Sequence, residues 1–204
     1  MDNQVKKIRK WLGTGSINIF GLPFAGKDTQ GRAFAEMFNG VVISSGDILR
    51  HNQENDKLQK IMAAGEIIPS ELFAELVLPY LSNSDYVGKP LILSEVGRMD
   101  GEQQVITRAT TYSGHPQKAV ILLKLTDQEV FNRFEAAKQI QDRGKRADDS
   151  REVLQTRLDS YHEKVTPVIE WYRQKGLLIE VDGSQSREEV TNEILKDLAN
   201  RASD

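Results

Sequence analysis

Four stretches of the sequence carry cations or backbone amides in places where they could bind phosphate. The first, GLPFAGKDTQ, has the spacing G-x-x-x-x-G-K from Gly21 to Lys27, between a short apolar run and an amphipathic segment. Between a strand and a helix, such a loop holds phosphates with its backbone N–H groups, while the lysine binds the terminal ones. The same letters could form a glycine-rich turn with a surface lysine, but the order of strand, loop and helix favours the phosphate loop.

Three further stretches each place an arginine where it could bind another phosphate group. ISSGDILR ends at Arg50, at the start of a helix, and LILSEVGR ends at Arg98, just after an apolar run. Open α/β sheets bind ligands at the carboxyl ends of their strands. In RGKRADDSREVLQTR, Arg146 and Arg157 flank another helix start. Taken singly, these stretches could be a helix cap, an exposed loop arginine and a solvated helix end.

Short apolar runs alternate with longer amphipathic segments along the chain. The runs are apolar nearly throughout, which is typical of strands covered on both faces of a parallel sheet. The alternation predicts an α/β fold with helices on both faces of that sheet. The predicted strands are Ile17–Leu22, Val41–Ser45, Pro90–Val96, Lys118–Leu125 and Gly176–Gly183. The predicted helices are Lys27–Phe38, Gly46–Ala64, Ser70–Ser82, Gly101–Tyr112, Asp127–Gln141, Ser150–Lys175 and Arg187–Ala202.

The composition narrows the class of protein. The chain has 204 residues, which suits one domain, and 27 Lys and Arg against 30 Asp and Glu, so no global basic field points to nucleic acid or an anionic membrane. It has no cysteine, which excludes disulfides and thiolate metal sites, and no apolar run of membrane-spanning length. We expect a cytoplasmic monomer with small-molecule partners. Its amino-terminal VKKIRKWLG should pack on the domain through Trp11 rather than bind a membrane.

From about Ile17 to Ala202, the sequence resembles the adenylate kinase-type nucleoside monophosphate kinases. That family has a phosphate loop G-x-P-G-x-G-K-G-T-Q, a motif S-T-G-D-x-x-R, a strand ending in D-G-F-P-R, and a lid edge G-R-x-D-D followed by an arginine. The matching residues are Gly21, Pro23, Gly26, Lys27, Thr29 and Gln30 in the loop, then Ser44, Ser45, Gly46, Asp47, Arg50, Arg98, Arg146 and Arg157. Motifs this numerous, in this order, are specific.

The resemblance implies a three-layer P-loop fold, one domain over residues 1–204, with a five-stranded parallel sheet and helices on both faces. It implies a monophosphate-binding insertion at residues 46–82 and a short lid at residues 134–147. The implied reaction is reversible transfer of the ATP γ-phosphoryl group, with Mg²⁺, to a nucleoside monophosphate such as AMP. ATP would contact Gly21, Pro23, Gly26, Lys27, Asp28, Thr29 and Arg133, and the monophosphate would contact Ser45, Gly46, Arg50, Ile68, Arg98, Glu102 and Gln103. The catalytic cations would be Lys27, Arg98, Arg146 and Arg157, because phosphoryl transfer depends on positioning and charge.

The chain departs from the family pattern at three important positions. Ser94 stands where the pattern has the aspartate that serves Mg²⁺, and Phe24 and Asp28 stand where it has glycine. The residue after the loop lysine contacts Mg²⁺ in the general phosphate loop, and Mg²⁺ accepts carboxylates together with phosphate oxygens. We therefore predict that the metal-holding carboxylate has moved from position 94 to Asp28. Glu95 is a second, less well-placed candidate for the same role. Alternatively, Asp28 only favours the helix N-terminus electrostatically.

The acceptor and the activity both leave an alternative open. Four residues after Arg98, where the family reads the base with glutamine, stands Glu102, followed by Gln103. Ser45 weakly favours a purine and AMP is the first choice, but an acidic residue could suit guanine, and a pyrimidine monophosphate is also possible. The rival activity is a catalytically impaired nucleotide-binding sensor or subunit that lost the carboxylate of position 94. The cations on both sides of the transfer point argue against that rival.

Overall fold

Five parallel strands form one sheet, as the sequence predicted. The computed structural model describes residues 2–52, 56–64, 66–140 and 150–203. The strand order is β2-β3-β1-β4-β5, and each neighbouring pair is parallel. The strands are β1 (Ser16–Gly21), β2 (Val41–Ser44), β3 (Leu91–Ser94), β4 (Gln117–Lys124) and β5 (Leu178–Asp182). Because Ser44 is paired with Ser94 and Ile19 with Ser94, the ends of β1, β2 and β3 meet at one edge.

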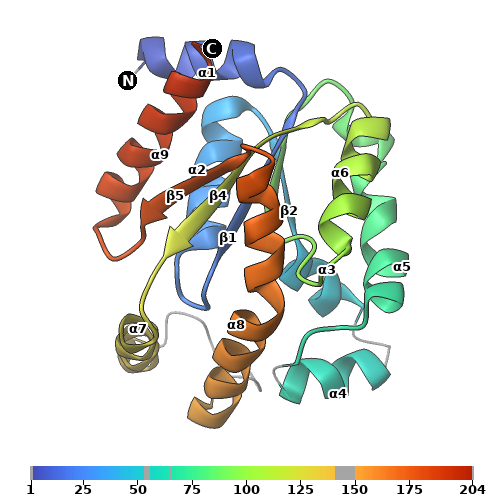
Figure 1. Cartoon of the computed structure of the whole chain (residues 1–204), viewed down its shortest axis with the longest axis vertical. Coiled ribbons are helices and arrows are strands. Elements are labelled where there is room, and N and C mark those ends of the chain that lie inside the picture. The colour runs from blue at the N-terminus through green and yellow to red at the C-terminus, as the bar shows by residue number, and fades with distance from the viewer. Residues whose placement is uncertain (1, 53–55, 65, 141–149, 204) are drawn as a thin grey trace.

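Helices cover both faces of the sheet (Figure 1). Along the described chain they are α1 (Asp2–Leu12), α2 (Lys27–Phe38), α3 (Ser45–His51), α4 (Asp56–Ala64), α5 (Ser70–Leu81), α6 (Glu102–Tyr112), α7 (Asp127–Ile140), α8 (Arg151–Gln174) and α9 (Arg187–Arg201). The predicted helix Gly46–Ala64 is wrong as one element, because α3 ends at His51. There the Asn52 side chain donates to the Ile48 carbonyl at 2.7 Å, which caps the end of the helix.

Alternate residues of the strands belong to different layers. Ile17 and Ile19 of β1 pack in the cluster that includes residues of α1, α2 and α9, whereas Phe20 packs with residues of α8. On the side of β2 and β3, buried residues of α3, α4, α5 and α6 form another cluster with Ile43 and Leu93. The central strands β1 and β3 are therefore buried on both faces, which is why their sequences are apolar nearly throughout, whereas the edge strand β5 exposes Glu180 and Asp182.

The amino-terminal helix packs on the domain, but Trp11 is not its main contact. α1 contacts α9, and both chain ends lie together in Figure 1. Ile8 and Leu12 of α1 are buried, whereas Trp11 is only partly buried against the same cluster. Across the described residues, no helix is long and apolar enough to cross a membrane.

The predicted insertion and lid are only partly covered by the described chain. Residues 46–82 hold most of α3 together with α4 and α5, beside the carboxyl ends of β2 and β3. The predicted lid at residues 134–147 begins inside α7, which continues to Ile140, and residues 141–149 lie outside the described chain. That both segments serve as binding insertion and lid stays a prediction.

Candidate active site

The phosphate loop joins β1 to α2, and two glycines fix its path. At Gly21, the end of β1, an added Cβ would lie 2.8 Å from the Leu123 carbonyl oxygen, so a larger residue would push the loop off β4. Gly26 caps α2 with φ 92°, a left-handed conformation that favours glycine. The Lys27 ammonium donates to the carbonyls of Gly21 at 2.6 Å and Leu22 at 3.0 Å. The protein itself thus holds the lysine over its loop.

Asp28 and Ser94, the two residues of the predicted metal site, are in direct contact. The Ser94 hydroxyl at the end of β3 donates to Asp28 Oδ1 at 2.7 Å. Ser94 is buried, and Asp28 is half-buried in the first turn of α2, where a negative charge is favourable. The carboxylate of residue 28 therefore lies where a side chain at position 94 also reaches.

A second carboxylate, that of Glu95, lies between the loop lysine and Arg98. Its Oε2 is 3.3 Å from Lys27 Nζ and 2.9 Å from Arg98 Nη2. The Glu95 side chain is only 6% exposed, and the residue has φ 54°, which is strained for any residue but glycine. Burial lowers the pKa of Lys27, and nearby Glu95 opposes that effect. Glu95 thus acts as the shared counter-ion of two cations.

Phe24 and Arg133 close the other side of the phosphate loop. Phe24 has φ 63°, which explains why glycine is the family residue at this position. Its ring lies edge-on to Phe134 with the ring centroids 5.7 Å apart. Arg133 donates to the carbonyls of Phe24 at 3.1 Å and Gly183 at 2.6 Å, so its guanidinium is fixed beside the loop. Phe24 therefore packs against α7 rather than entering the phosphate cradle.

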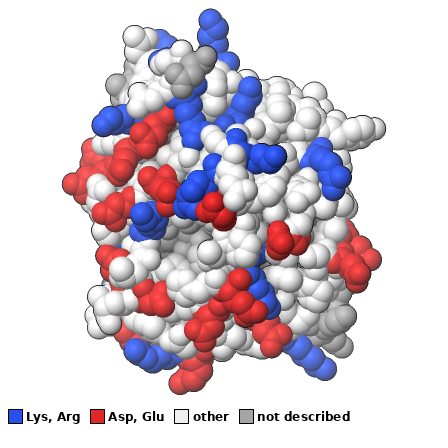
Figure 2. All heavy atoms as spheres, viewed as in Figure 1, with Lys and Arg blue, Asp and Glu red and all other residues white. Residues whose placement is uncertain are grey.

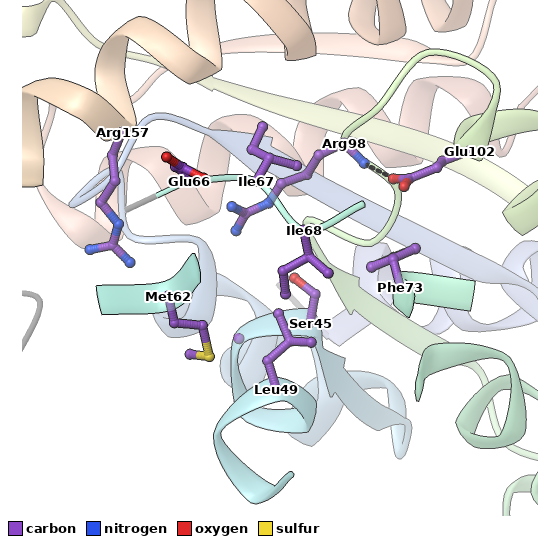
Figure 3. A pocket seen from close by; sticks show the side chains of 11 residues that line it. Ser45, Leu49, Met62, Glu66, Ile67, Ile68, Phe73, Arg98, Glu102 and Arg157 are labelled. Carbon is purple, nitrogen blue, oxygen red and sulfur yellow. Dashed lines mark hydrogen bonds between the residues drawn. The ribbon is translucent and has the colours of Figure 1, made fainter. Parts of the chain in front are cut away.

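A pocket lies between the loop that follows β3 and the segments of the predicted insertion (Figure 3). Its empty volume is about 610 Å³, which includes space open to solvent. In Figure 3 the side chains of Arg98 and Arg157 extend into the same space from the loop after β3 and from α8. The pocket is lined by Ser45, Gly46, Leu49, Met62, Glu66, Ile67, Ile68, Phe73, Arg98, Glu102 and Arg157.

Glu102, and not Gln103, lines this pocket. Glu102 Oε2 accepts from the backbone N–H groups of Arg98 at 2.8 Å and Met99 at 3.0 Å. Gln103 is fully buried and donates to Asp100 at 3.1 Å, so its amide is used inside the loop. Ser45 is buried too, and its hydroxyl donates to the Glu95 carbonyl at 3.0 Å.

The remaining predicted residues are placed to different extents. Pro23 lies in the loop and Thr29 in the first turn of α2, beside Asp28. Arg50 lies in α3, but its side chain is outside what the structure describes. Arg146 lies outside the described residues altogether. For both arginines, the predicted contact with phosphate stays a prediction.

The comparison with known proteins agrees with this geometry. The family model described as "Adenylate kinase" matches residues 19–177. This chain belongs to the adenylate kinase family. It is similar to the adenylate kinase of a Nocardioides species, with 34% identity over 88% of this chain and 95% of that protein. It also resembles those of Parvibaculum lavamentivorans, at 33% identity over 86% and 88%, and Fusobacterium nucleatum, at 29% over 89% and 97%.

Within the adenylate kinase family, this chain is a nucleoside monophosphate kinase, a phosphotransferase that acts on ATP and AMP.

The sequence did not indicate that Leu49, Met62 and Phe73 line the pocket, because apolar residues at helical spacing are typical of the core. It also gave Glu95 a minor role, although a carboxylate beside the phosphate-binding arginine was a visible signal. Over the face seen in Figure 2, Lys and Arg are interspersed with Asp and Glu, as suits a protein that binds small nucleotides.

Proposed function

We propose that this adenylate kinase transfers the γ-phosphoryl group of ATP to AMP between Lys27 on one side and Arg98 with Arg157 on the other. One observation carries the proposal: a single carboxylate oxygen of Glu95 contacts both Lys27 Nζ, at 3.3 Å, and Arg98 Nη2, at 2.9 Å. The donor-side and acceptor-side cations are therefore close enough to hold one small anion between them. A transferring phosphoryl group is such an anion.

The donor side is built for a nucleoside triphosphate. The loop from Gly21 to Gly26 and the start of α2 offer backbone N–H groups to the phosphates, with Lys27 as a point charge. Pro23 and Thr29 belong to the same loop and first turn. Arg133, fixed by its two carbonyl bonds, would lie against the adenine. Because these parts are held in place before the nucleotide arrives, little ordering is needed on binding.

The acceptor side is the pocket lined by Ser45, Gly46, Ile68 and Arg98. Arg98 Nε is buried and makes no hydrogen bond within the described chain, so it has a donor left for the acceptor phosphate. Arg50 and Arg146 would complete the cationic lining, as the family pattern predicts. Residues 46–82 would form the monophosphate-binding insertion and residues 134–147 the short lid.

The residues around Asp28 fit a magnesium ion that enters with ATP. Asp28 and Ser94 offer carboxylate and hydroxyl oxygens, which Mg²⁺ prefers as ligands. Mg²⁺ needs only one or two carboxylates besides phosphate oxygens. Asp28 would hold the ion or its waters, and the 2.7 Å bond from Ser94 fixes the orientation of Asp28 Oδ1. When bound, Mg²⁺ offsets negative charge on the donor phosphates. Asp28 thus supplies the carboxylate for Mg²⁺ that the family pattern has at position 94.

An exchange of the two positions tests the magnesium site. Asp28→Asn should lower kcat and raise the Mg²⁺ concentration needed for half-maximal rate, whereas the double variant Asp28→Gly with Ser94→Asp should recover both. The recovery follows because the hydroxyl of residue 94 already lies in contact with the carboxylate of residue 28. If Asp28→Asn leaves rate and Mg²⁺ dependence unchanged, Asp28 serves only the helix N-terminus.

A coupled assay of ATP with AMP tests the proposed function as a whole. We expect ADP formation that is lost in Lys27→Met and strongly reduced in Arg98→Lys, because a lysine cannot bind phosphate bidentately. Tight ATP binding without turnover of any of AMP, GMP, CMP, UMP or dTMP would instead support the sensor. That the enzyme acts as a monomer, in the cytoplasm, stays a prediction.

A further inference from the structure

We infer that this adenylate kinase accepts a guanine monophosphate in addition to AMP, through the Glu102 carboxylate. The inference rests on the proposed acceptor pocket and names a second substrate for it. Glu102 is 6% exposed and lines that pocket from the amino-terminal end of α6. Its Oε1 is buried and has no hydrogen-bond partner among the residues that the structure describes.

The two oxygens of Glu102 have different roles. Oε2 is used by the backbone N–H groups of Arg98, at 2.8 Å, and Met99, at 3.0 Å. These bonds fix the carboxylate, and Oε1 stays buried at the wall of the pocket without a partner among the described residues. An ionised carboxylate only accepts hydrogen bonds, so the group cannot turn to present a donor, as a glutamine amide can. A ligand that brings an N–H to this point satisfies a buried oxygen that is otherwise unpaired.

The purine bases differ in what they bring to such an acceptor. Adenine offers its exocyclic amine, but the neighbouring ring nitrogen is itself an acceptor and would face the carboxylate unfavourably. Guanine offers a ring N–H and an adjacent exocyclic amine, so that two neighbouring donors face one carboxylate oxygen. Both bases can therefore bind, and the carboxylate favours the guanine edge relative to a glutamine at the same position.

The walls of the pocket do not oppose this choice. Leu49, Met62, Ile68 and Phe73 line it with apolar surface, which contacts the flat faces of either purine equally well. Glu66 adds a second, exposed carboxylate to the lining. Unlike Glu66, Glu102 is buried and held by two backbone N–H groups, so we assign the polar selection of the base to Glu102.

Three acceptors with the same sugar and phosphate test the inference in the wild-type enzyme. We measure kcat/KM with ATP for AMP, for IMP, whose ring nitrogen carries a hydrogen, and for GMP, which adds the amine. We expect kcat/KM for GMP to lie within about 100-fold of that for AMP and above that for IMP. For comparison, a site built to reject a base with the wrong donor pattern discriminates by about 10⁴. GMP turnover more than about 100-fold below that of AMP overturns the inference and leaves the proposed function standing. No turnover of either monophosphate refutes the proposed function itself.

Glu102→Gln then assigns the effect to this side chain. It should lower the GMP/AMP ratio of kcat/KM at least about tenfold, the factor that corresponds to one hydrogen bond to a charged group. A smaller change overturns the role of Glu102. The matched control is Glu75→Gln, which removes an exposed carboxylate from α5 and should leave the ratio unchanged. Because the readout is a ratio within one preparation, a partial loss of folded enzyme does not affect it.

Discussion

Replacing Glu95 with glutamine should destabilise the free enzyme, because it leaves the largely buried Lys27 and the partly exposed Arg98 without their shared anion. The carboxylate is 6% exposed and lies 3.3 Å from Lys27 Nζ, which is itself only 13% exposed. Removing one partner of a buried pair costs about 3–5 kcal/mol. Arg98 is 35% exposed, so water screens part of its charge and its share is smaller. We therefore expect Glu95→Gln to lower the free energy of unfolding by about 3 kcal/mol.

Urea unfolding at neutral pH measures this loss. The midpoint should fall while the slope m stays unchanged, because the surface exposed on unfolding is the same. The matched control is Glu135→Gln, which breaks the pair between Arg151 and Glu135, at 3.7 Å and with side chains 61% and 51% exposed. That exposed pair should contribute less than about 1 kcal/mol.

The same variant predicts an unusual response to ligand. If phosphate groups take the place of the Glu95 carboxylate between Lys27 and Arg98, saturating ATP should raise the midpoint of Glu95→Gln more than that of the wild type. Stabilities of Glu95→Gln and wild type that agree within about 0.5 kcal/mol, a difference typical of surface substitutions, would refute the shared counter-ion.

Two further predictions concern the phosphate loop. Phe24→Ala should lower the free energy of unfolding by about 2 kcal/mol, because it removes a partly buried ring from its contact with Phe134. Phe24→Gly should lower it by no more, because glycine adopts φ 63° without strain. A glycine variant clearly less stable than the alanine variant in urea would contradict this. Burial lowers the pKa of Lys27 from 10.5, so ATP affinity measured by calorimetry should fall as pH rises, beginning below 10.5. Over the same range the unfolded chain holds the proton of Lys27 more tightly, so the contribution of Lys27 to stability rises with pH. If the affinity for ATP does not change up to pH 10.5, Lys27 stays charged and the prediction is wrong.

The fold was largely predictable because the residues of each helix or strand indicate its type without reference to the rest of the chain. β1 and β3 are buried on both faces, and the short apolar runs placed all five strands within two residues of their ends. The end of α3 at His51 could not be predicted, because the sequence on both sides continues the helical pattern; in the structure the Asn52 side chain donates to the Ile48 carbonyl there. Likewise Trp11 looked like the anchor of α1 by size, although the direction of the helix buries Ile8 and Leu12.

The site was predictable where a motif fixes the backbone, and less so where side chains choose among partners. The glycine spacing located the loop and Lys27. The move of the metal-holding carboxylate from position 94 to Asp28 was inferred from two separate departures. It stays a prediction, and the 2.7 Å hydrogen bond between Ser94 and Asp28 is consistent with it. The sequence did not distinguish Glu102 from Gln103, because which of two neighbours faces a pocket depends on the turn that precedes α6. There, two backbone N–H groups bind Glu102 and leave Gln103 to Asp100.

The departures from the family pattern share one physical theme. At positions 24 and 95, where the pattern has glycine, Phe24 and Glu95 keep left-handed backbones of φ 63° and 54°. Each costs roughly 1–2 kcal/mol relative to glycine. Phe24 offsets its strain by packing on Phe134, and Glu95 offsets its own through two ion pairs, so both loops keep a left-handed backbone with larger side chains. Two carboxylates, Asp28 and Glu95, now flank Lys27. Because both carboxylates would repel bare phosphates, we predict that this enzyme depends on Mg²⁺ for binding ATP as well as for turnover.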